Sequence, residues 1–373
     1  HILFFLSFDI MNATALHKLN LTSLEAWEPN QRQIDQWAVN TETLDALLNR
    51  QNALGNMVID PLINPNKKNE VRIWWNDFCG REATDCTNDN GCGPLTANPS
   101  KVDFKDYEIT GCIKDGFSIN EETFTGSFMS IEQNFIDNQN KVISNLLNKL
   151  NQKAIVFLEA NAGLNKGGQF VESGGKYIIP NPTGPSSSTI YTKIIRDGIV
   201  SRLNNPFILD YGNFWEMNMN AQFEQGNGEG KGNAARSRYF NIVSDLFGGT
   251  QVPAVAGTSF LVAPYAFAFV NKSFFQKRTH PVNGHVEFTG SIPKWDDALG
   301  KYKWYINIPG YNIVVDVLKS RQCINGNEDT YSHVFQYRLT YDFLLNPTGC
   351  PNGDGDAVSG IIAYQNETIP ASS

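Results

Sequence analysis

The chain has 373 residues and a formal net charge of −8, with 30 Lys or Arg residues against 38 Asp or Glu residues. This length is sufficient for a large hydrophobic core, in one domain or in two or three closely packed ones. The apolar fraction of 41% argues against an intrinsically disordered protein. Proteins that grip nucleic acid by its phosphates usually carry clustered Lys and Arg. The sequence contains no such tract, so a dedicated nucleic-acid-binding protein is not indicated.

The first ten residues, "HILFFLSFDI", begin with His1 instead of Met. They lack the basic n-region and the small-residue cleavage site of a signal peptide. Met11 opens a more usual polar start. We therefore interpret residues 1–10 as read-through or as part of a longer fragment, with a degraded secretory segment as the alternative.

Residues 11–65 are mixed and polar, with one short helical pattern at Glu42–Leu54. Pro61 and Pro65 close the segment. Its apolar residues are too sparse for a core of its own. We expect residues 1–65 to form an N-terminal arm that lies on other surfaces.

A hairpin pattern follows the arm. In "EVRIWW" the residues Val71, Ile73 and Trp75 fall on one face, and the segment "KVDFKDYEITGCIK" from Lys101 is its expected partner strand. A polar insert runs between them from Cys79 to Pro99. The pattern predicts two antiparallel strands with a long tip, which together form a projecting β-hairpin.

The strongest helical signal lies in the next segment. Apolar residues recur there at a helical period over about thirty residues, which predicts a helix of roughly 45 Å. The stripe consists of Phe128, Ile131, Phe135, Val142, Ile143, Leu146, Leu147, Leu150, Ala154, Phe157 and Leu158. Ser118-x-x-Glu121 is a candidate capping box, and Gly163 is placed to end the helix. Such a long helix needs a partner along its whole apolar face.

Residues 164–190 form a Gly/Pro/Ser-rich connection, which a second amphipathic helix at about 190–203 and the strand-like "PFILDYG" follow. The apolar stretch Val252–Val270 is nearly long enough to span a bilayer. Pro253 and Pro264 interrupt it, however, and no cluster of basic residues directly flanks it. We expect a buried turn, strand and helix there instead of a membrane span.

The last third of the chain is rich in strand patterns. Phe335, Tyr337, Leu339, Tyr341 and Phe343 alternate with polar residues, which predicts a half-buried strand. The segments "YKWYINI", "NIVVDVL" and "GIIAYQN" are expected to be its neighbours. The fold class is therefore α+β: a hairpin arm, one long helix, mixed elements and a closing sheet.

One glycine-rich stretch, Gly226–Arg238 ("GNGEGKGNAARSR"), invites a test for phosphate binding. A Walker loop needs Ser or Thr directly after its Lys, whereas Lys231 is followed by Gly232. A dinucleotide fingerprint needs a buried strand before it, and the preceding residues are polar. We expect a flexible exposed loop.

Other motifs of catalysis and metal binding are also missing. His280 and His285 share a Pro/Gly loop without a metal-binding spacing, and no GxSxG elbow occurs. The loop from Asn352 lacks the Gly and Glu of a calcium loop. We therefore predict a protein that is not an enzyme, with no catalytic residue, no cofactor and no bound metal.

The six cysteines contain no CxxC pair. Three of them, Cys79, Cys86 and Cys92, lie close together in the polar insert. We interpret them as unligated or structural thiols, with a metal site and a disulfide as open alternatives. Four N-x-S/T sequons, which chance produces in an Asn-rich chain, occur at Asn12, Asn20, Asn271 and Asn366.

A family resemblance is carried by "VDFKDYEITGCIKDGFSINEETF" leading into "FMSIEQNFIDNQNKVISNLLNKLNQKAIVFLEANAG". It continues in "IPGYNIVVDVLKSRQC", "YSHVFQYRLTYDFLLNPTGC" and the final "GIIAYQN". In these segments and in element order, most of residues 11–366 resembles the tailed-bacteriophage major capsid proteins of the Hong Kong 97 fold. The likeness is greatest to those of phages that infect Bacteroidetes-like hosts.

The resemblance implies an assignment of the chain. Its parts would be an N-arm (1–65), an E-loop hairpin (66–120), a peripheral domain (121–190) with a spine helix at 121–163, a mostly axial domain (191–300) and closing strands that return to the periphery (301–373). It also implies a structural protein that self-assembles through hexamer and pentamer capsomers, in the bacterial host cytoplasm, into the icosahedral virion shell around double-stranded DNA. Expected partners are further copies and scaffolding, portal and decoration proteins, with no membrane and no sequence-specific DNA contact.

Two other classes of protein stay open. An encapsulin-type nanocompartment would share the fold and enclose protein cargo, although the polar insert at Cys79–Pro99 argues weakly against it. A secreted adhesin or binding protein would use the sequons for glycans and the cysteines for disulfides. Titration of free thiols distinguishes the secreted protein from a capsid protein, because assembly in a cytoplasm predicts mostly reduced cysteines.

Overall fold

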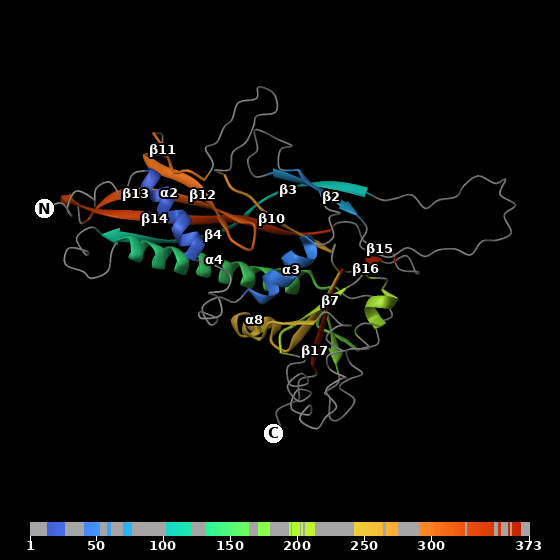
Figure 1. Cartoon of the computed structure of the whole chain (residues 1–373). Helices are drawn as coiled ribbons and strands as arrows, with labels where there is room; N and C mark the ends of the chain where they lie inside the picture. The colour runs from blue at the N-terminus through green and yellow to red at the C-terminus, as the bar shows by residue number, and fades with distance from the viewer. Residues whose placement is uncertain are drawn as a thin grey trace, which may run out of the picture.

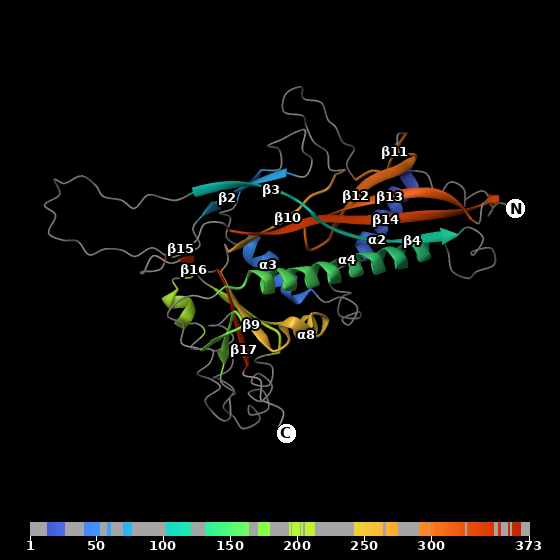
Figure 2. The same ribbon diagram turned by 180° about the vertical axis from the view of Figure 1, so that it is seen from behind.

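The protein folds into a mixture of helices and sheets (Figures 1 and 2). The computed structural model describes residues 13–26, 41–52, 58–60, 70–76, 102–120, 131–163, 171–179, 194, 196–201, 203, 206–212, 242–263, 266–274, 291–297, 299–324, 327–346, 350–351, 357–358 and 360–366. In that part of the chain no helix is both long and apolar enough to cross a membrane.

The long helix α4 (Ile131–Asn161) has 31 residues, as the apolar period predicts. Its buried side chains follow most of the predicted stripe, with one apolar and two polar residues added, whereas Ile131 and Phe157 of the stripe are only half-buried. The buried side chains are Phe135, Gln139, Val142, Ile143, Leu146, Leu147, Leu150, Asn151, Ala154, Ile155 and Leu158. The predicted capping box is wrong, because Ser118 belongs to strand β4 (Gly111–Asn120) and pairs with Val334. Sheet pairing outweighs the local capping signal there.

The first sheet has six strands, and one face of it lies on α4 (Figure 1). Its order is β10 (Phe267–Asn271), β14 (Asn327–Leu345), β13 (Ile313–Ile324), β12 (Lys301–Ile308) and β11 (Lys294–Asp296), with β4 also pairing with β14. The predicted alternation in β14 is confirmed: Phe335, Tyr337, Leu339, Tyr341 and Phe343 are all buried. The ring of Phe135 on α4 lies 5.1 Å from that of Phe335.

The predicted hairpin forms in a three-stranded sheet of β1 (Val58–Asp60), β2 (Glu70–Asn76) and β3 (Val102–Glu108). Val71, Ile73 and Trp75 share a buried face, as expected. They pack with Ala268 and Leu344 of the first sheet. Phe343, next to Leu344 on β14, points to the other face of the strand and stacks on Phe157 of α4. The hairpin and α4 therefore cover opposite sides of the first sheet.

The expected second strand of the hairpin divides in two. β3 ends at Glu108, and β4 then leaves the hairpin to pair with β14. Residues 111–120 therefore belong to the main sheet, although the sequence assigns them to the hairpin. The polar insert Cys79–Pro99 lies outside the described residues.

A second six-stranded sheet lies at the C-terminal end of α4 (Figure 2). Its order is β5 (Val171–Ser173), β6 (Lys176–Ile179), β17 (Ile361–Asn366), β9 (Thr258–Val262), β7 (Phe207–Asp210) and β8 (Ile242–Ser244). The predicted strand at "PFILDYG" is thus present. The expected place of "GIIAYQN" beside β14 is wrong, because β17 pairs with β6 and β9. Its residues 361–364 are fully buried, so alternation gives no indication of a sheet.

Four smaller features complete the fold. The stretch Val252–Val270 forms a 3-10 turn (Pro253–Val255) followed by β9, as expected, but its last part is strand β10 and not a helix. A short helix α8 (Leu246–Gln251) precedes that turn, and β15 (Cys350–Pro351) pairs with β16 (Ala357–Val358). The amphipathic helix expected at 190–203 is represented by helical residues at 194 and 196–200.

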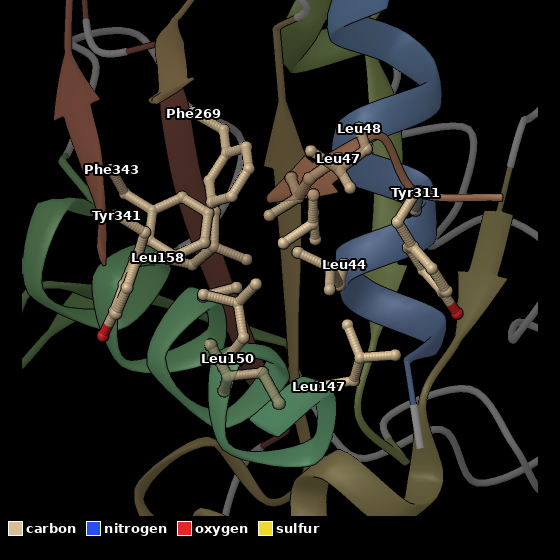
Figure 3. Packing of buried hydrophobic residues seen from close by; sticks show 14 of the residues in the cluster. Leu44, Leu47, Leu48, Leu147, Leu150, Leu158, Phe269, Tyr311, Tyr341 and Phe343 are labelled. Atoms are coloured by element: carbon tan, nitrogen blue, oxygen red, sulfur yellow. The ribbon is translucent and has the colours of Figure 1, made fainter. Parts of the chain in front are cut away.

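The N-terminal segment differs from the expected arm. It contains α2 (Ala13–Ala26) and the predicted helix α3 (Glu42–Asn52), and both lie against α4 of the same chain. Leu16, Leu44 and Leu47 are fully buried in the main core. A few apolar residues at helical spacing are therefore sufficient, because α4 and the sheets supply the rest of the core (Figure 3).

Candidate assembly surfaces

The β2–β3 hairpin is anchored to its own subunit by its inner face. The Lys272 Nζ atom, on the segment that follows β10, donates a hydrogen bond to the Glu70 carbonyl oxygen at 3.3 Å. The Tyr107 hydroxyl donates to the Leu345 carbonyl oxygen at 3.4 Å. These contacts add to the buried apolar face, so the two strands are held in place while their outer face remains exposed.

That outer face carries a compact cluster of four side chains. Arg72 lies opposite Asp106, with Nε to Oδ1 at 2.7 Å and Nη2 to Oδ2 at 2.9 Å. Trp74 lies opposite Phe104, with ring centroids 4.9 Å apart, and the Arg72 guanidinium lies 4.4 Å from the Phe104 ring centroid. We call Arg72, Trp74, Phe104 and Asp106 the outer hairpin cluster.

The outer hairpin cluster combines order with exposure. Trp74 is 37% and Phe104 is 47% exposed. The hydrogen bond from Arg72 lowers the pKa of the Asp106 carboxyl, so the pair stays charged at neutral pH. Aromatic residues and Arg contribute most of the binding energy at protein interfaces. The cluster is therefore suited to a contact with another protein surface.

A second exposed apolar group lies at the β11 edge of the first sheet. Ile292, Trp295 and Leu299 are each about half exposed, and the Trp295 and Tyr302 rings meet edge to face at 5.1 Å. Among the described strands β11 pairs only with β12. An edge strand with exposed apolar side chains is another candidate contact surface.

The residues tested for chemistry fall mostly outside the described part of the chain. This holds for Gly226–Arg238, for His280 and His285, for Cys79, Cys86 and Cys92, and for Asn352. Among the described residues there is no group of three or more His, Cys, Asp or Glu side chains that could hold a metal. Cys112 on β4 is a free, exposed thiol.

Two of the four sequon asparagines use their side chains inside the fold. Asn20 on α2 is buried, and its Nδ2 donates to the Leu16 carbonyl oxygen at 2.7 Å. The Nδ2 atom of Asn271 donates to the carbonyl oxygens of Val314 at 3.1 Å and Thr340 at 2.9 Å. A glycan at either nitrogen would break these contacts, so these two positions are structural.

The hydrogen bond of one buried tyrosine was beyond the reach of sequence patterns, although its burial was predicted. Tyr337 on β14 is fully buried, and its hydroxyl donates to Gln139 Oε1 of α4 at 2.9 Å. Burial raises the pKa of Tyr337 well above its ordinary value, so the hydroxyl stays protonated and serves as a donor. Its role is to join the sheet to α4.

No protein-family model matches the sequence. No curated protein matches it either. The fold is similar to a solved structure named "Mycobacterium phage Adephagia", at 11% identity and a TM-score of 0.40, over 87% of this chain and 91% of that chain. A second is named "Asymmetric unit of bacteriophage PhiM1 mature capsid", at 10% identity and a TM-score of 0.37, over 82% of this chain and 84% of that chain. A third is named "Capsid structure of the Cyanophage P-SCSP1u", at 12% identity and a TM-score of 0.36, over 83% and 86%.

Proposed function

We propose that this chain is the major capsid protein of a tailed bacteriophage, with the Hong Kong 97 fold. Copies of it assemble through hexamer and pentamer capsomers into the icosahedral shell that encloses a double-stranded DNA genome. Two of the solved structures above carry the word capsid in their names. For this chain the role is argued from its own geometry and from the sequence resemblance.

The observation that carries the proposal is the two-sided hairpin. Its inner face is buried on its own subunit, whereas its outer face presents two ordered aromatic rings and a charged pair to solvent. Exposed aromatic rings held in one geometry lose little conformational entropy on binding. A second copy that covers the outer hairpin cluster would convert this surface into a strong contact.

The capsid domains can be assigned to the two sheets. We assign the peripheral domain to α4 with the first sheet, and the axial domain to the second sheet. Relative to the boundaries from sequence, β4, β10 and β11 join the peripheral part and β5, β6 and β17 join the axial part, because of the sheets to which they belong. On this proposal α4 is the spine helix, β2 and β3 form the base of the E-loop, and the helical part of residues 1–65 is packed on its own subunit.

The partners follow from the proposed role. They are other copies of the chain, together with scaffolding, portal and decoration proteins. The packaged DNA is enclosed without sequence-specific contacts. A net charge of −8 suits a container that does not hold its polyanionic content tightly.

The test is assembly of the purified protein, followed by sedimentation velocity and negative-stain imaging. We expect the wild type to form capsomers, shells or tubes. The double variant Trp74→Ser with Phe104→Ser should stay folded and remain largely as free subunits. Val171→Ser, which removes another exposed apolar side chain on β5, is the control and should assemble normally. A stable, monodisperse wild-type monomer at micromolar concentration would falsify the proposal.

A further inference from the structure

We infer that helix α3 is a strap that fixes the orientation of the second sheet relative to the first. Both sheets contact α4, and α3 contacts β10 of the first sheet as well as β8 of the second (Figures 1 and 2). Leu44, Leu47 and Leu48 of α3 point into the shared core beside Leu147 and the other labelled side chains of α4 (Figure 3). The start of α3 then makes polar contacts with both sheets.

The contact with the first sheet is made by Thr41, directly before α3. Its Oγ1 atom lies 2.8 Å from the Tyr311 hydroxyl oxygen, and both residues are buried. Tyr311 lies in the turn between β12 and β13, where its backbone N–H donates to the Ile308 carbonyl oxygen. Thr41 thus attaches the strap to the end of a hairpin in the first sheet.

The contact with the second sheet is made two residues later. Thr43 Oγ1 donates to Asp245 Oδ2 at 2.6 Å and lies 2.8 Å from the Tyr211 hydroxyl oxygen. Tyr211 follows β7, and Asp245 follows β8 and caps α8 by accepting from the Gly248 N–H at 2.6 Å. Burial raises the pKa of Tyr211 well above its ordinary value, so Tyr211 donates to Thr43 while Thr43 donates to Asp245.

The long helix closes this network through Asn151. Its Oδ1 atom accepts from the Leu44 N–H at 2.8 Å, and its Nδ2 donates to Asp245 Oδ2 at 3.2 Å. Asn151 is fully buried in the middle of an otherwise apolar stripe. Thr41, Thr43 and Leu44 therefore join the first sheet, the second sheet and α4 within one turn of chain.

The chemistry of these contacts explains why they set an angle. Apolar contacts tolerate small rotations, whereas buried hydrogen bonds weaken steeply when their geometry changes, and an unpaired buried group costs about 1–3 kcal/mol. A rotation of one sheet would break either the Thr41 or the Thr43 contact. Release of α3, in contrast, would free the angle without breaking a strand pair in either sheet.

One consequence rests on the proposed function. In a closed shell with five-fold and six-fold positions, identical subunits adopt slightly different shapes. The angle between the two sheets is a coordinate along which they can differ, and α3 would determine how far it moves. Loss of the strap should then broaden the range of particle sizes and shapes.

The test uses free subunits of the full chain and compares Thr41→Val with Thr43→Val, singly and together. Valine keeps the shape of threonine and removes the hydroxyl. Spin labels on unnatural amino acids at Lys114 of β4 and Glu172 of β5 report the distance between the sheets, since both positions are exposed. We expect a narrow distance distribution in wild type, a broader one in each single variant and the broadest in the double variant.

Hydrogen exchange on the same samples shows whether the effect is local. In the double variant, amides of α3 should exchange about tenfold faster, whereas β13 and β14 should keep their protection. Thr250→Val is the matched control, because its exposed Oγ1 bonds only to the Phe247 carbonyl oxygen in its own helix, and it should match wild type. If the double variant does not fold, the single variants and Thr43→Ser test the inference. Thr43→Ser keeps a hydroxyl, so its distance distribution should stay narrow.

Faster exchange in α3 with an unchanged distance distribution would overturn the inference, because α3 would then be a packing element without influence on the angle. No change in either measurement would overturn it as well. Neither measurement requires assembly. A wild-type subunit that never assembles would therefore refute the proposed function without touching the strap.

Discussion

Helix α3 and the β2–β3 hairpin come from neighbouring parts of the sequence, yet they are used in opposite ways. The sequence suggests that both are extensions with too little core of their own. In the structure α3 is a core element with Leu44 and Leu47 fully buried, and the hairpin is a surface layer with Trp74 and Phe104 exposed. The number of apolar residues in a segment therefore does not determine where they are buried. That depends on the surfaces that distant parts of the chain bring alongside.

The largest expected effect is a loss of subunit stability when a buried side chain of α3 is shortened. Leu44→Ala should lower the free energy of unfolding of the isolated subunit by about 2–5 kcal/mol, because it leaves a cavity in the main core. Leu21→Ala on α2 is the control: that side chain is 47% exposed and its loss should cost little. Chemical denaturation of non-assembled protein measures both. Equal, small effects would mean that α3 is an arm after all.

The contrast also shows what could be predicted from the sequence. The long helix, the hairpin strand β2 and the buried face of β14 were all predictable, because each has a strong period of 3.6 or 2. The position of β17, the strand character of β10 and the burial of α3 were not. β17 and β10 are short segments with nearly continuous burial, so local patterns do not indicate which partner they choose.

The candidate site was less predictable than the fold. The alternation in "EVRIWW" places Trp74 on the other face of the strand from Val71 and Ile73. Its pairing with Phe104, however, depends on the strand register across a long insert. Thr43 gave no signal, and the residue type of Asn151 did not show that its side chain is buried. The signal that could have found Asn151 is its place in the stripe, between Leu147 and Leu158.

A smaller loss of stability is expected at the buried hydrogen bonds between α4 and the start of α3. Asn151→Ala removes the acceptor of the Leu44 N–H and one donor to Asp245, and should cost about 1–3 kcal/mol of unfolding free energy. Asn145, on the same helix as Asn151, makes an exposed contact to Asp115 of β4, and Asn145→Ala, which removes it, is the matched control. If Asn145→Ala destabilised the subunit as much as Asn151→Ala, the importance of the buried network would be refuted.

The next prediction concerns the charge at the start of α3. Burial and the nearby carboxylates of Asp245 and Asp45 raise the pKa of Glu42. A raised pKa in the folded state means that Glu42 favours folding when protonated, and that this contribution is lost as the pH rises through the folded pKa. Glu42→Gln should therefore raise the melting temperature at about pH 7 and have almost no effect at about pH 3.

Melting curves of Glu42→Gln at several pH values check this. Glu172→Gln on β5 neutralises an exposed carboxylate and serves as the control. A stabilisation that persists unchanged at acidic pH would contradict an electrostatic cause.

The last prediction is that nucleotides have no effect on the melting temperature, and it concerns the glycine-rich stretch. If Gly226–Arg238 held nucleotide phosphates, ATP or GTP with magnesium would raise the melting temperature through ligand linkage. We expect no shift at millimolar nucleotide. A shift that disappears in Lys231→Ala would reopen the possibility of an enzyme.

Cryo-electron microscopy of the assembled wild-type protein tests the central claim most directly. We expect closed shells or capsomers in which Trp74 and Phe104 are covered by a neighbouring subunit while α3 remains on its own α4. Particles in which the outer hairpin cluster faces solvent, or a preparation that contains only monomers, would contradict it.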